Sequence, residues 1–274
     1  MSRLRFLMCP PLHFGVEYVI NPWMEGQIHA TDPALANRQW GRLHALLGEH
    51  AEVVSLPAVP GLPDLVFTAN AALIHRRTAV LSSFRYPERQ PESHHFGKWL
   101  AADGFDVRTL PPGVLFEGAG DALFDRSEPL LWLGHGMRSD IAAQPYLERF
   151  VGVEVQPLRL QDPCFYHLDT CFCPLERGYL LYYPPAFDAA GNAAIEARIP
   201  PDRRLTLSRE DALNFACNTV NIGTALILND ASPALASRLN ECGFEVITTL
   251  LTEFIRAGGA AKCLSLRLDE HVSA

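Results

Sequence analysis

Short runs of apolar residues recur along the chain between segments rich in proline and glycine. The runs that predict buried strands are residues 65–67, 79–81, 130–133, 179–183, 224–228 and 263–268. Helical patterns lie between them, at residues 33–50, 92–103, 139–150, 208–213 and 233–242. Because short strands and helices alternate over the whole length, the pattern predicts an α/β fold.

Two of the predicted helix-to-strand junctions have nearly the same sequence. Residues 104–107 read Gly-Phe-Asp-Val, and residues 243–246 read Gly-Phe-Glu-Val. In each, the glycine ends a helix and the following residues begin a strand. This similarity indicates that the chain contains internal repeats.

A polar residue followed by small and apolar residues also recurs at regular intervals. The series comprises Asn21, Asn70, Asp121, Asp169, Asn218 and Cys263, with spacings of 45 to 51 residues. A period near fifty residues predicts similar modules closed into a ring, which makes residues 1–274 a single domain. In such a ring these side chains face one central pocket. The alternative is accidental spacing in an ordinary α/β protein.

The charge balance narrows the classes of partner. The chain has 23 Lys and Arg against 31 Asp and Glu, a formal net charge of -8, and it has no basic cluster. This disfavours nucleic acid and favours small cationic molecules. No apolar stretch is long enough for a signal peptide or a membrane-spanning helix. Seven cysteines, an odd number, disfavour a disulfide scaffold, so we expect a cytoplasmic protein that binds no membrane.

Cys263 is a candidate nucleophile. It follows residues 258–262, Gly-Gly-Ala-Ala-Lys, and begins a predicted strand. Glycines allow a ligand to approach the backbone closely, and a neighbouring positive charge favours the thiolate form of a cysteine. The alternative is a small apolar residue at the start of a strand.

His167 is the histidine best suited to transfer a proton to or from such a thiol. Residues 165–169, Phe-Tyr-His-Leu-Asp, alternate apolar and polar side chains, which predicts a strand with His167 and Asp169 on one face. A carboxylate in that position would orient and tune the imidazole. The other nine histidines fit a solvated surface or the core.

Two acidic residues, Glu117 and Asp121, are separated by Gly-Ala-Gly. Carboxylates so close together need a cation, a proton or water, and a guanidinium offers planar N–H donors that match them. An exposed acidic turn is the alternative. A zinc site is disfavoured because the candidate ligands Cys164, His167, Cys171 and Cys173 do not have the usual paired spacing.

Taken together, four segments resemble the guanidine-modifying enzymes of the pentein superfamily. They are Pro63-Asp64 with Phe67-Thr68-Ala69-Asn70, residues 116–121, residues 167–169 and residues 258–263, in this order. The resemblance covers essentially the whole chain and implies a five-bladed α/β propeller. It also implies that Cys263 is the nucleophile, His167 the general acid and base, and Glu117 a guanidinium-binding carboxylate. Asp169, and either Asp121 or Asp64, would assist, with no cofactor and no metal.

Asn70 distinguishes branches of this superfamily. Deiminases and dimethylarginine dimethylaminohydrolases commonly have an acid in this segment, whereas Asn70, together with Asn21 in Asn-Pro-Trp-Met, resembles the arginine dihydrolase branch. That branch converts arginine to ornithine, ammonia and carbon dioxide. The same resemblance suggests Arg89 and Arg138 as binders of the amino-acid carboxylate. Arg85 is an alternative candidate to Arg89. Arg89 and Arg138 could both instead be solvated surface arginines.

Four other activities remain as alternatives at this level. A dimethylarginine dimethylaminohydrolase or an arginine deiminase would form citrulline, and an amidinotransferase would pass the amidino group to an amine. A ribosome-binding propeller protein would need neither Cys263 nor His167, so their presence disfavours it. The sequence leaves open whether the protein is a homo-oligomer.

Overall fold

The computed structural model describes residues 4–271, and within them the strands form five sheets of three strands each. Each sheet has the same construction. Its first two strands pair antiparallel, and its second and third strands pair parallel across a helical connection. A parallel pair needs such a crossover, whereas an antiparallel pair needs only a tight turn. The predicted α/β repeat is therefore present as five similar modules.

The first module comprises β15 (Leu266–Arg267), β1 (Arg5–Met8), α1 (Pro33–His50) and β2 (Glu52–Ser55). The second comprises β3 (Ala72–His75), β4 (Thr78–Leu81), α2 (Glu92–Ala102) and β5 (Asp106–Arg108). The third comprises β6 (Ala122–Phe124), β7 (Leu130–His135), α3 (Gln144–Val151) and β8 (Glu154–Arg159). The fourth comprises β9 (Phe172–Leu175), β10 (Tyr179–Tyr182), α4 (Ala189–Arg198) and β11 (Arg204–Thr206), followed by α5 (Arg209–Leu213). The fifth comprises β12 (Val220–Ile222), β13 (Ala225–Leu228), α6 (Pro233–Glu241) and β14 (Glu245–Thr248), followed by α7 (Thr252–Ile255).

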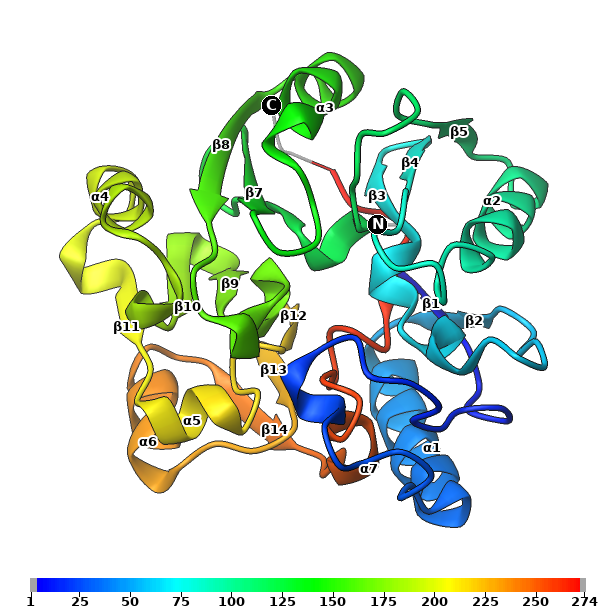
Figure 1. Ribbon diagram of the computed structural model, residues 1–274. Coiled ribbons are helices and arrows are strands. Elements are labelled where there is room, and N and C mark those ends of the chain that lie inside the picture. Colours follow the sequence, from blue (N-terminus) through cyan, green and yellow to red (C-terminus); the bar gives the residue numbers. More distant parts are fainter. Residues whose placement is uncertain (1–3, 272–274) are drawn as a thin grey trace.

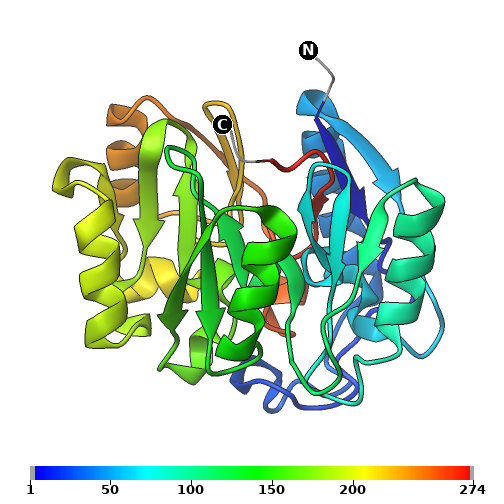
Figure 2. The same ribbon diagram turned by 90° about the horizontal axis from the view of Figure 1, so that it is seen from above.

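The five sheets lie around a common centre, and helices α1, α2, α3, α4 and α6 lie on the outside of this ring (Figure 1). Figure 2, seen from above, shows the helices standing against the outer strands. Apolar side chains such as Leu43, Phe96, Leu147 and Leu239 fill the space between each helix and its sheet. No helix in residues 4–271 is long and apolar enough to cross a membrane.

Both ends of the described chain contribute to the first sheet. β15 pairs antiparallel with β1, so that Leu266 lies opposite Leu7 and Arg267 opposite Phe6. Cys263, near the C-terminal end, therefore occupies in this module the place that Asn70 occupies in the second. Asn21 does not precede a strand; it caps a short 3-10 helix, Pro22–Met24, so its inclusion in the repeat series was wrong.

Hydrogen bonds between the turns that precede the first strands join each module to the next. The five bonds are Ala69 N to Cys263 O (3.1 Å), Asn70 Nδ2 to Glu117 O (3.3 Å), Leu168 N to Asp121 Oδ1 (3.0 Å), Asn218 Nδ2 to Asp169 O (3.1 Å) and Cys263 N to Asn218 Oδ1 (3.0 Å). Together they form a closed circuit, which we call the axial ring. The polar residues of the repeat series other than Asn21 all belong to it.

The helix boundaries follow the predicted signals closely. Asp32 and Ser232 cap α1 and α6 with their side chains, and a proline follows each. Gly104 and Gly243, after α2 and α6, have φ values of +85° and +77°, which glycine adopts without steric strain. α3 begins at Gln144 rather than at residue 139 because residues 141–143 form a separate 3-10 turn.

Three predicted strands are wrong in whole or in part. Residues 65–67 lie in and beside the 3-10 helix Pro63–Val66, and residues 165–169 lie in the 3-10 helices Pro163–Phe165 and Leu168–Thr170. Of residues 263–268, only Leu266–Arg267 form a strand. These segments are nearly fully buried at the ring centre, so their apolar pattern reflects burial on all sides rather than a strand face.

Substitution of Gly118 tests how tightly the axial ring is packed. Gly118 has a φ of +62°, and an added Cβ would lie 2.9 Å from Ala72 N and 2.9 Å from Ser82 Oγ. Gly113 has a similar φ of +87° with nothing within 4 Å. We expect Gly113→Ala to lower the unfolding free energy by about 1–2 kcal/mol through backbone strain alone. Gly118→Ala should lower it by about 1–3 kcal/mol more through overpacking.

Denaturant unfolding of both variants measures this difference. Equal losses of stability in the two variants would contradict the packing described at Gly118.

Candidate active site

Seven of the ten predicted site residues line one cavity at the ring centre. They are Asn21, Asp64, Asn70, Arg89, Arg138, His167 and Cys263. All seven are buried, so the alternative of solvated arginines at positions 89 and 138 is wrong. The remaining three, Glu117, Asp121 and Asp169, are also buried. Glu117 contacts His167 and Asp169 contacts Cys263, whereas Asp121 accepts a hydrogen bond from the backbone N–H of Leu168, the residue after His167.

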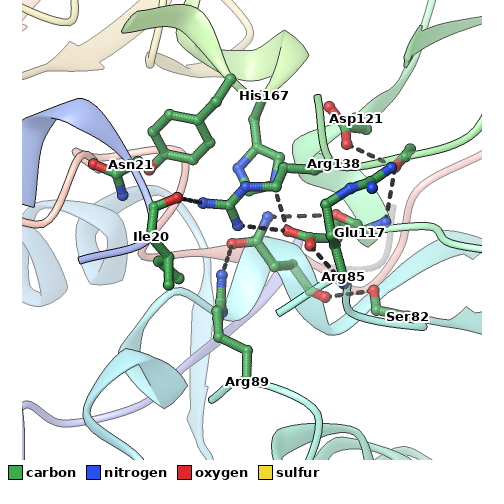
Figure 3. Close-up of polar contacts among 12 residues, drawn as sticks. Ile20, Asn21, Ser82, Arg85, Arg89, Glu117, Asp121, Arg138 and His167 are labelled. Atoms are coloured by element: carbon green, nitrogen blue, oxygen red, sulfur yellow. Dashed lines mark hydrogen bonds and ion pairs between the residues drawn. The ribbon is translucent and has the colours of Figure 1, made fainter. Parts of the chain in front are cut away.

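His167 is held by Glu117 rather than by Asp169. Its Nε2 lies 2.7 Å from Glu117 Oε2, and the same oxygen accepts a hydrogen bond from Arg138 Nη1 at 3.2 Å (Figure 3). The predicted pairing of His167 with Asp169 is wrong because the 3-10 turn at Leu168–Thr170 directs the two side chains differently from a strand. Tyr166 packs against the imidazole with ring centroids 4.8 Å apart.

Glu117 is a buried carboxylate that stays ionised. Burial alone would raise its pKa, but Arg138 and His167 outweigh burial and lower the pKa well below its ordinary value. The other carboxylate oxygen, Oε1, accepts a hydrogen bond from the backbone N–H of Arg85 at 3.1 Å. A buried charge with this many partners fixes the position and orientation of the imidazole.

Cys263 lies across the cavity, at the end of the glycine-containing loop. Its Sγ lies 3.5 Å from Asp169 Oδ2 and accepts a hydrogen bond from Asn218 Nδ2 at 3.0 Å. Burial and the nearby Asp169 raise the pKa of the thiol well above its ordinary value, so the side chain is a neutral thiol near pH 7. A cation bound beside it would reverse this preference. Gly259 provides the room, because an added Cβ would lie 2.5 Å from the Phe67 ring.

Asp121 supports the site from behind. One of its carboxylate oxygens accepts a hydrogen bond from Ser139 Oγ at 2.6 Å, and the other accepts one from the backbone N–H of Leu168 at 3.0 Å. Burial raises its pKa to about 6. Glu117 and Asp121 each have protein partners of their own, and their sharing of one guanidinium stays a prediction.

Arg89 carries a fixed positive charge into the cavity wall. Its guanidinium binds Glu92 through two hydrogen bonds, of 2.9 and 2.8 Å, and donates to Asn70 Oδ1 at 2.9 Å. Arg85 instead lies at the surface side and pairs with Asp140 at 3.0 Å. Of the two competing arginines, Arg89 therefore lines the cavity.

Asp64 has an unused acceptor. Its Oδ2 accepts a hydrogen bond from the Tyr18 hydroxyl at 2.9 Å, whereas its buried Oδ1 has no hydrogen-bond partner within residues 4–271. Burial raises its pKa. An unsatisfied buried carboxylate oxygen is costly, and a donor on a bound ligand would satisfy it.

The segment between β1 and α1 covers the cavity. Asn21 Nδ2 donates to Ala257 O at 3.1 Å, and Arg138 Nη2 donates to Ile20 O at 2.8 Å (Figure 3). On the neighbouring side the Tyr166 hydroxyl donates to Gly258 O at 2.6 Å. The first bond ties the covering segment to the loop of Cys263, the second ties it to Arg138, and the third joins the loops that carry His167 and Cys263. Within residues 4–271 no group of three or more His, Cys, Asp or Glu side chains is placed to hold a metal ion.

Comparison with known proteins identifies the family. A model of the eukaryotic N,N-dimethylarginine dimethylhydrolases matches residues 43–268. A dimethylarginine dimethylaminohydrolase from Mycobacterium tuberculosis is 35% identical over 267 residues, which is 96% of this chain and 85% of that protein. The chain belongs to the dimethylarginine dimethylaminohydrolase family. The superfamily resemblance noted in the sequence is thereby confirmed.

Other members of the family are more similar in sequence. The bifunctional arginine dihydrolase/ornithine cyclodeaminase AgrE of Nostoc sp. is 54% identical over 271 residues, 99% of this chain but 38% of that protein. The chain thus spans well under half the length of this relative. A crystal structure of the N-terminal domain of ArgZ, a cyanobacterial arginine dihydrolase, has a TM-score of 0.98 at 52% identity and covers 98% of this chain and 100% of its own.

Two residues that support the site of this chain were not predicted from the sequence: Glu92, which anchors Arg89, and Tyr18, which anchors Asp64. Asn218, which contacts Cys263, was predicted to face the central pocket as a member of the repeat series, but no role was predicted for it. Glu92 had no sequence signal beyond its place at the start of a helix.

Asp169 makes stability depend on pH. Burial raises its pKa from 3.8 to about 7, so the folded state binds a proton that the unfolded state releases. This contribution is full below about pH 4 and is lost as the pH rises towards about 7. The unfolding free energy of the wild type relative to Asp169→Asn should therefore fall over that range, by at most about 1.4 kcal/mol per pH unit.

Denaturant unfolding at several pH values measures this trend. The corresponding difference for Asp121→Asn should level off nearer pH 6, where its own raised pKa lies. A difference for Asp169→Asn that rises or stays flat with pH would contradict the assignment.

Proposed function

We propose that this chain is a cysteine-dependent arginine dihydrolase, which converts L-arginine and two waters into ornithine, two ammonia and carbon dioxide. The observation that carries the proposal is the meeting of Cys263, His167 and the ionised Glu117 at one buried cavity with basic and acidic walls. Residues 1–274 would act as one catalytic domain. We further infer that its five modules constitute a five-bladed α/β propeller.

The relatives support this choice of reaction. The N-terminal domain of ArgZ has been solved with substrate, with product and, as an asparagine-to-serine variant, covalently bonded to a reaction intermediate. AgrE has been solved with L-arginine in a cysteine-to-alanine variant. The 54% identity to AgrE extends over 99% of this chain, so the same substrate is the first to test here.

The cavity offers complementary walls for the two ends of arginine. Behind one wall Asp169 lies against the thiol, and its charge would act on the cationic guanidinium next to Cys263. On the other side, Arg89 and Arg138 would bind the carboxylate of the amino acid. Asp64, with its unsatisfied oxygen, and Asn21 would receive the N–H donors of the substrate. Because Arg89 and Arg138 already have buried acidic partners, their positions are fixed before the substrate arrives.

The first half of the reaction forms a covalent adduct. The bound guanidinium favours the thiolate of Cys263, whose proton passes to His167, and the thiolate attacks the central guanidinium carbon to give a tetrahedral adduct. His167, oriented by Glu117, gives this proton to a terminal nitrogen, and ammonia leaves as the C–N bond breaks. A thiouronium linked to Cys263 remains.

The second half restores the enzyme. His167, now neutral, removes a proton from a water molecule, which attacks the thiouronium carbon; breaking of the C–S bond releases a ureido product and the thiolate. A second round on this neutral group releases another ammonia and leaves a carbamate, which breaks down to ornithine and carbon dioxide. Asn70 suits both rounds. A carboxylate would bind a cation in preference to a neutral urea, whereas an amide discriminates less between the two.

Dimethylarginine hydrolysis is the second candidate, because the matching family model describes that activity. It would release dimethylamine and leave citrulline. Asn70, in the segment where that activity commonly has an acid, favours the dihydrolase instead.

The stoichiometry of the products distinguishes these reactions. With L-arginine, we expect two ammonia per ornithine and no accumulation of citrulline, measured by amino-acid chromatography and an ammonia assay. One ammonia with one citrulline would indicate a deiminase, and a new guanidino product in the presence of glycine would indicate an amidinotransferase. Release of dimethylamine from dimethylarginine, without turnover of arginine, would favour the second candidate.

Cys263→Ala is the control for this experiment. The variant should lose roughly a thousandfold or more of the activity while remaining folded, since it lacks the nucleophile. Substantial residual activity would remove the covalent mechanism.

Asn70→Asp should separate the two rounds. The carboxylate favours the cationic guanidinium and cannot donate to Glu117 O as the amide does at 3.3 Å. We expect the second round to slow by roughly ten- to a hundredfold, so that citrulline accumulates. Asn229 is a buried asparagine that does not line the cavity, so Asn229→Asp should keep the wild-type ratio of ammonia to ornithine. An unchanged ammonia-to-ornithine ratio in Asn70→Asp would contradict the assigned role.

A further inference from the structure

The side chain of Asn218 makes four hydrogen bonds around Cys263. Its Oδ1 accepts from the backbone N–H groups of Ala260 at 3.2 Å and of Cys263 at 3.0 Å. Its Nδ2 donates to Asp169 O at 3.1 Å and to Cys263 Sγ at 3.0 Å. Because two N–H groups face Oδ1, the orientation of the amide is fixed, and one N–H must point at the sulfur.

The surroundings of Asn218 make this orientation rigid. The residue is fully buried and its backbone carbonyl accepts a hydrogen bond from Lys262 N at 3.2 Å. It belongs to the axial ring, where it occupies the same place in the fifth module as Cys263 occupies in the first. The loop that carries the nucleophile is thus held at three backbone N–H groups by one residue of the neighbouring module.

We propose that Asn218 is a catalytic residue for the proposed reaction: it fixes the loop of Cys263 through its amide oxygen and stabilises the thiolate through its amide N–H. The proposal rests on the function assigned above to Cys263. A neutral donor suits this position. It strengthens as the sulfur becomes negative, and it adds no charge that would repel the guanidinium.

The groups that face the sulfur explain why such a donor is needed. Burial opposes ionisation, as does Asp169, which lies 3.5 Å away, whereas the backbone N–H of Ala260, the side chain of Asn218 and the charge of Lys262 favour it. Tyr166 and His167 border the same cavity. Among the side chains of residues 4–271, Asn218 is the neutral hydrogen-bond donor to Sγ.

The reactivity of Cys263 tests the proposal without measuring arginine turnover. The rate of alkylation by iodoacetamide is followed against pH by mass spectrometry of the peptide that contains Cys263. In Asn218→Asp the N–H donor becomes a carboxylate of nearly the same shape. The midpoint of the alkylation profile should rise by roughly one to two pH units, and alkylation at pH 7 should slow by roughly ten- to a hundredfold.

Asn229→Asp is the matched control. Asn229 is also a buried asparagine of the fifth module; it donates to Asn214 O at 3.0 Å and accepts from Leu251 N at 2.8 Å, away from the thiol. Its substitution should leave the alkylation midpoint at the wild-type value. A midpoint unchanged in folded Asn218→Asp would overturn the proposal, even if arginine turnover were lost, because that result indicates a structural role only.

A measurement on the wild type covers the case in which Asn218→Asp does not fold. The side-chain amide protons of Asn218, followed by NMR, should shift with the same midpoint as the alkylation of Cys263, because one of them bonds to the titrating sulfur. An amide signal that does not follow this midpoint would overturn the proposal. If the wild type shows this coupling but does not hydrolyse arginine, the function assigned above fails and the role of Asn218 towards the thiol stands.

Discussion

The axial ring of hydrogen bonds is the constraint on which the rest of the structure depends. Each module contributes one turn to the ring centre, and each turn bonds to the turn of the next module. These turns carry Asn70, Asp121, Asp169, Asn218 and Cys263. Because the backbone polar groups of a buried turn need partners, the ring satisfies them and brings residues from both halves of the chain to within contact distance.

The burial of ionisable groups is the second constraint, and the site meets it in one way for its ion pairs and in another for its thiol. Glu117 and Arg89 have close partners of opposite charge, Arg138 and Glu92, which keep these groups ionised and immobile. For Cys263, by contrast, burial and Asp169 outweigh the effect of Lys262 and raise the pKa of the thiol well above its ordinary value. The ion pairs fix the geometry of the site before a ligand binds, whereas Cys263 needs a cationic ligand to become a thiolate.

This division suits a reaction on a cation that becomes neutral part-way. In the proposed reaction the guanidinium would activate the thiol when it binds, so that the thiolate forms only beside its substrate. After the first ammonia leaves, that activation would be lost, and a fixed neutral donor such as Asn218 would become more important for the second round. Asn70 contributes in the same direction, because an amide does not require its ligand to be charged.

The sequence by itself determined the repeat, the α/β class, the limits of α1, α2 and α6 and most of the residues at the centre, because caps, glycines and spacing are local signals. It did not predict α4. It predicted that Cys263 and His167 belong to one site. Only the tertiary structure decided their partners: His167 is held by Glu117, and Asp169 lies against Cys263. Those contacts depend on the rotation of buried 3-10 turns, and uniform burial at the ring centre leaves no periodic pattern from which that rotation could be read.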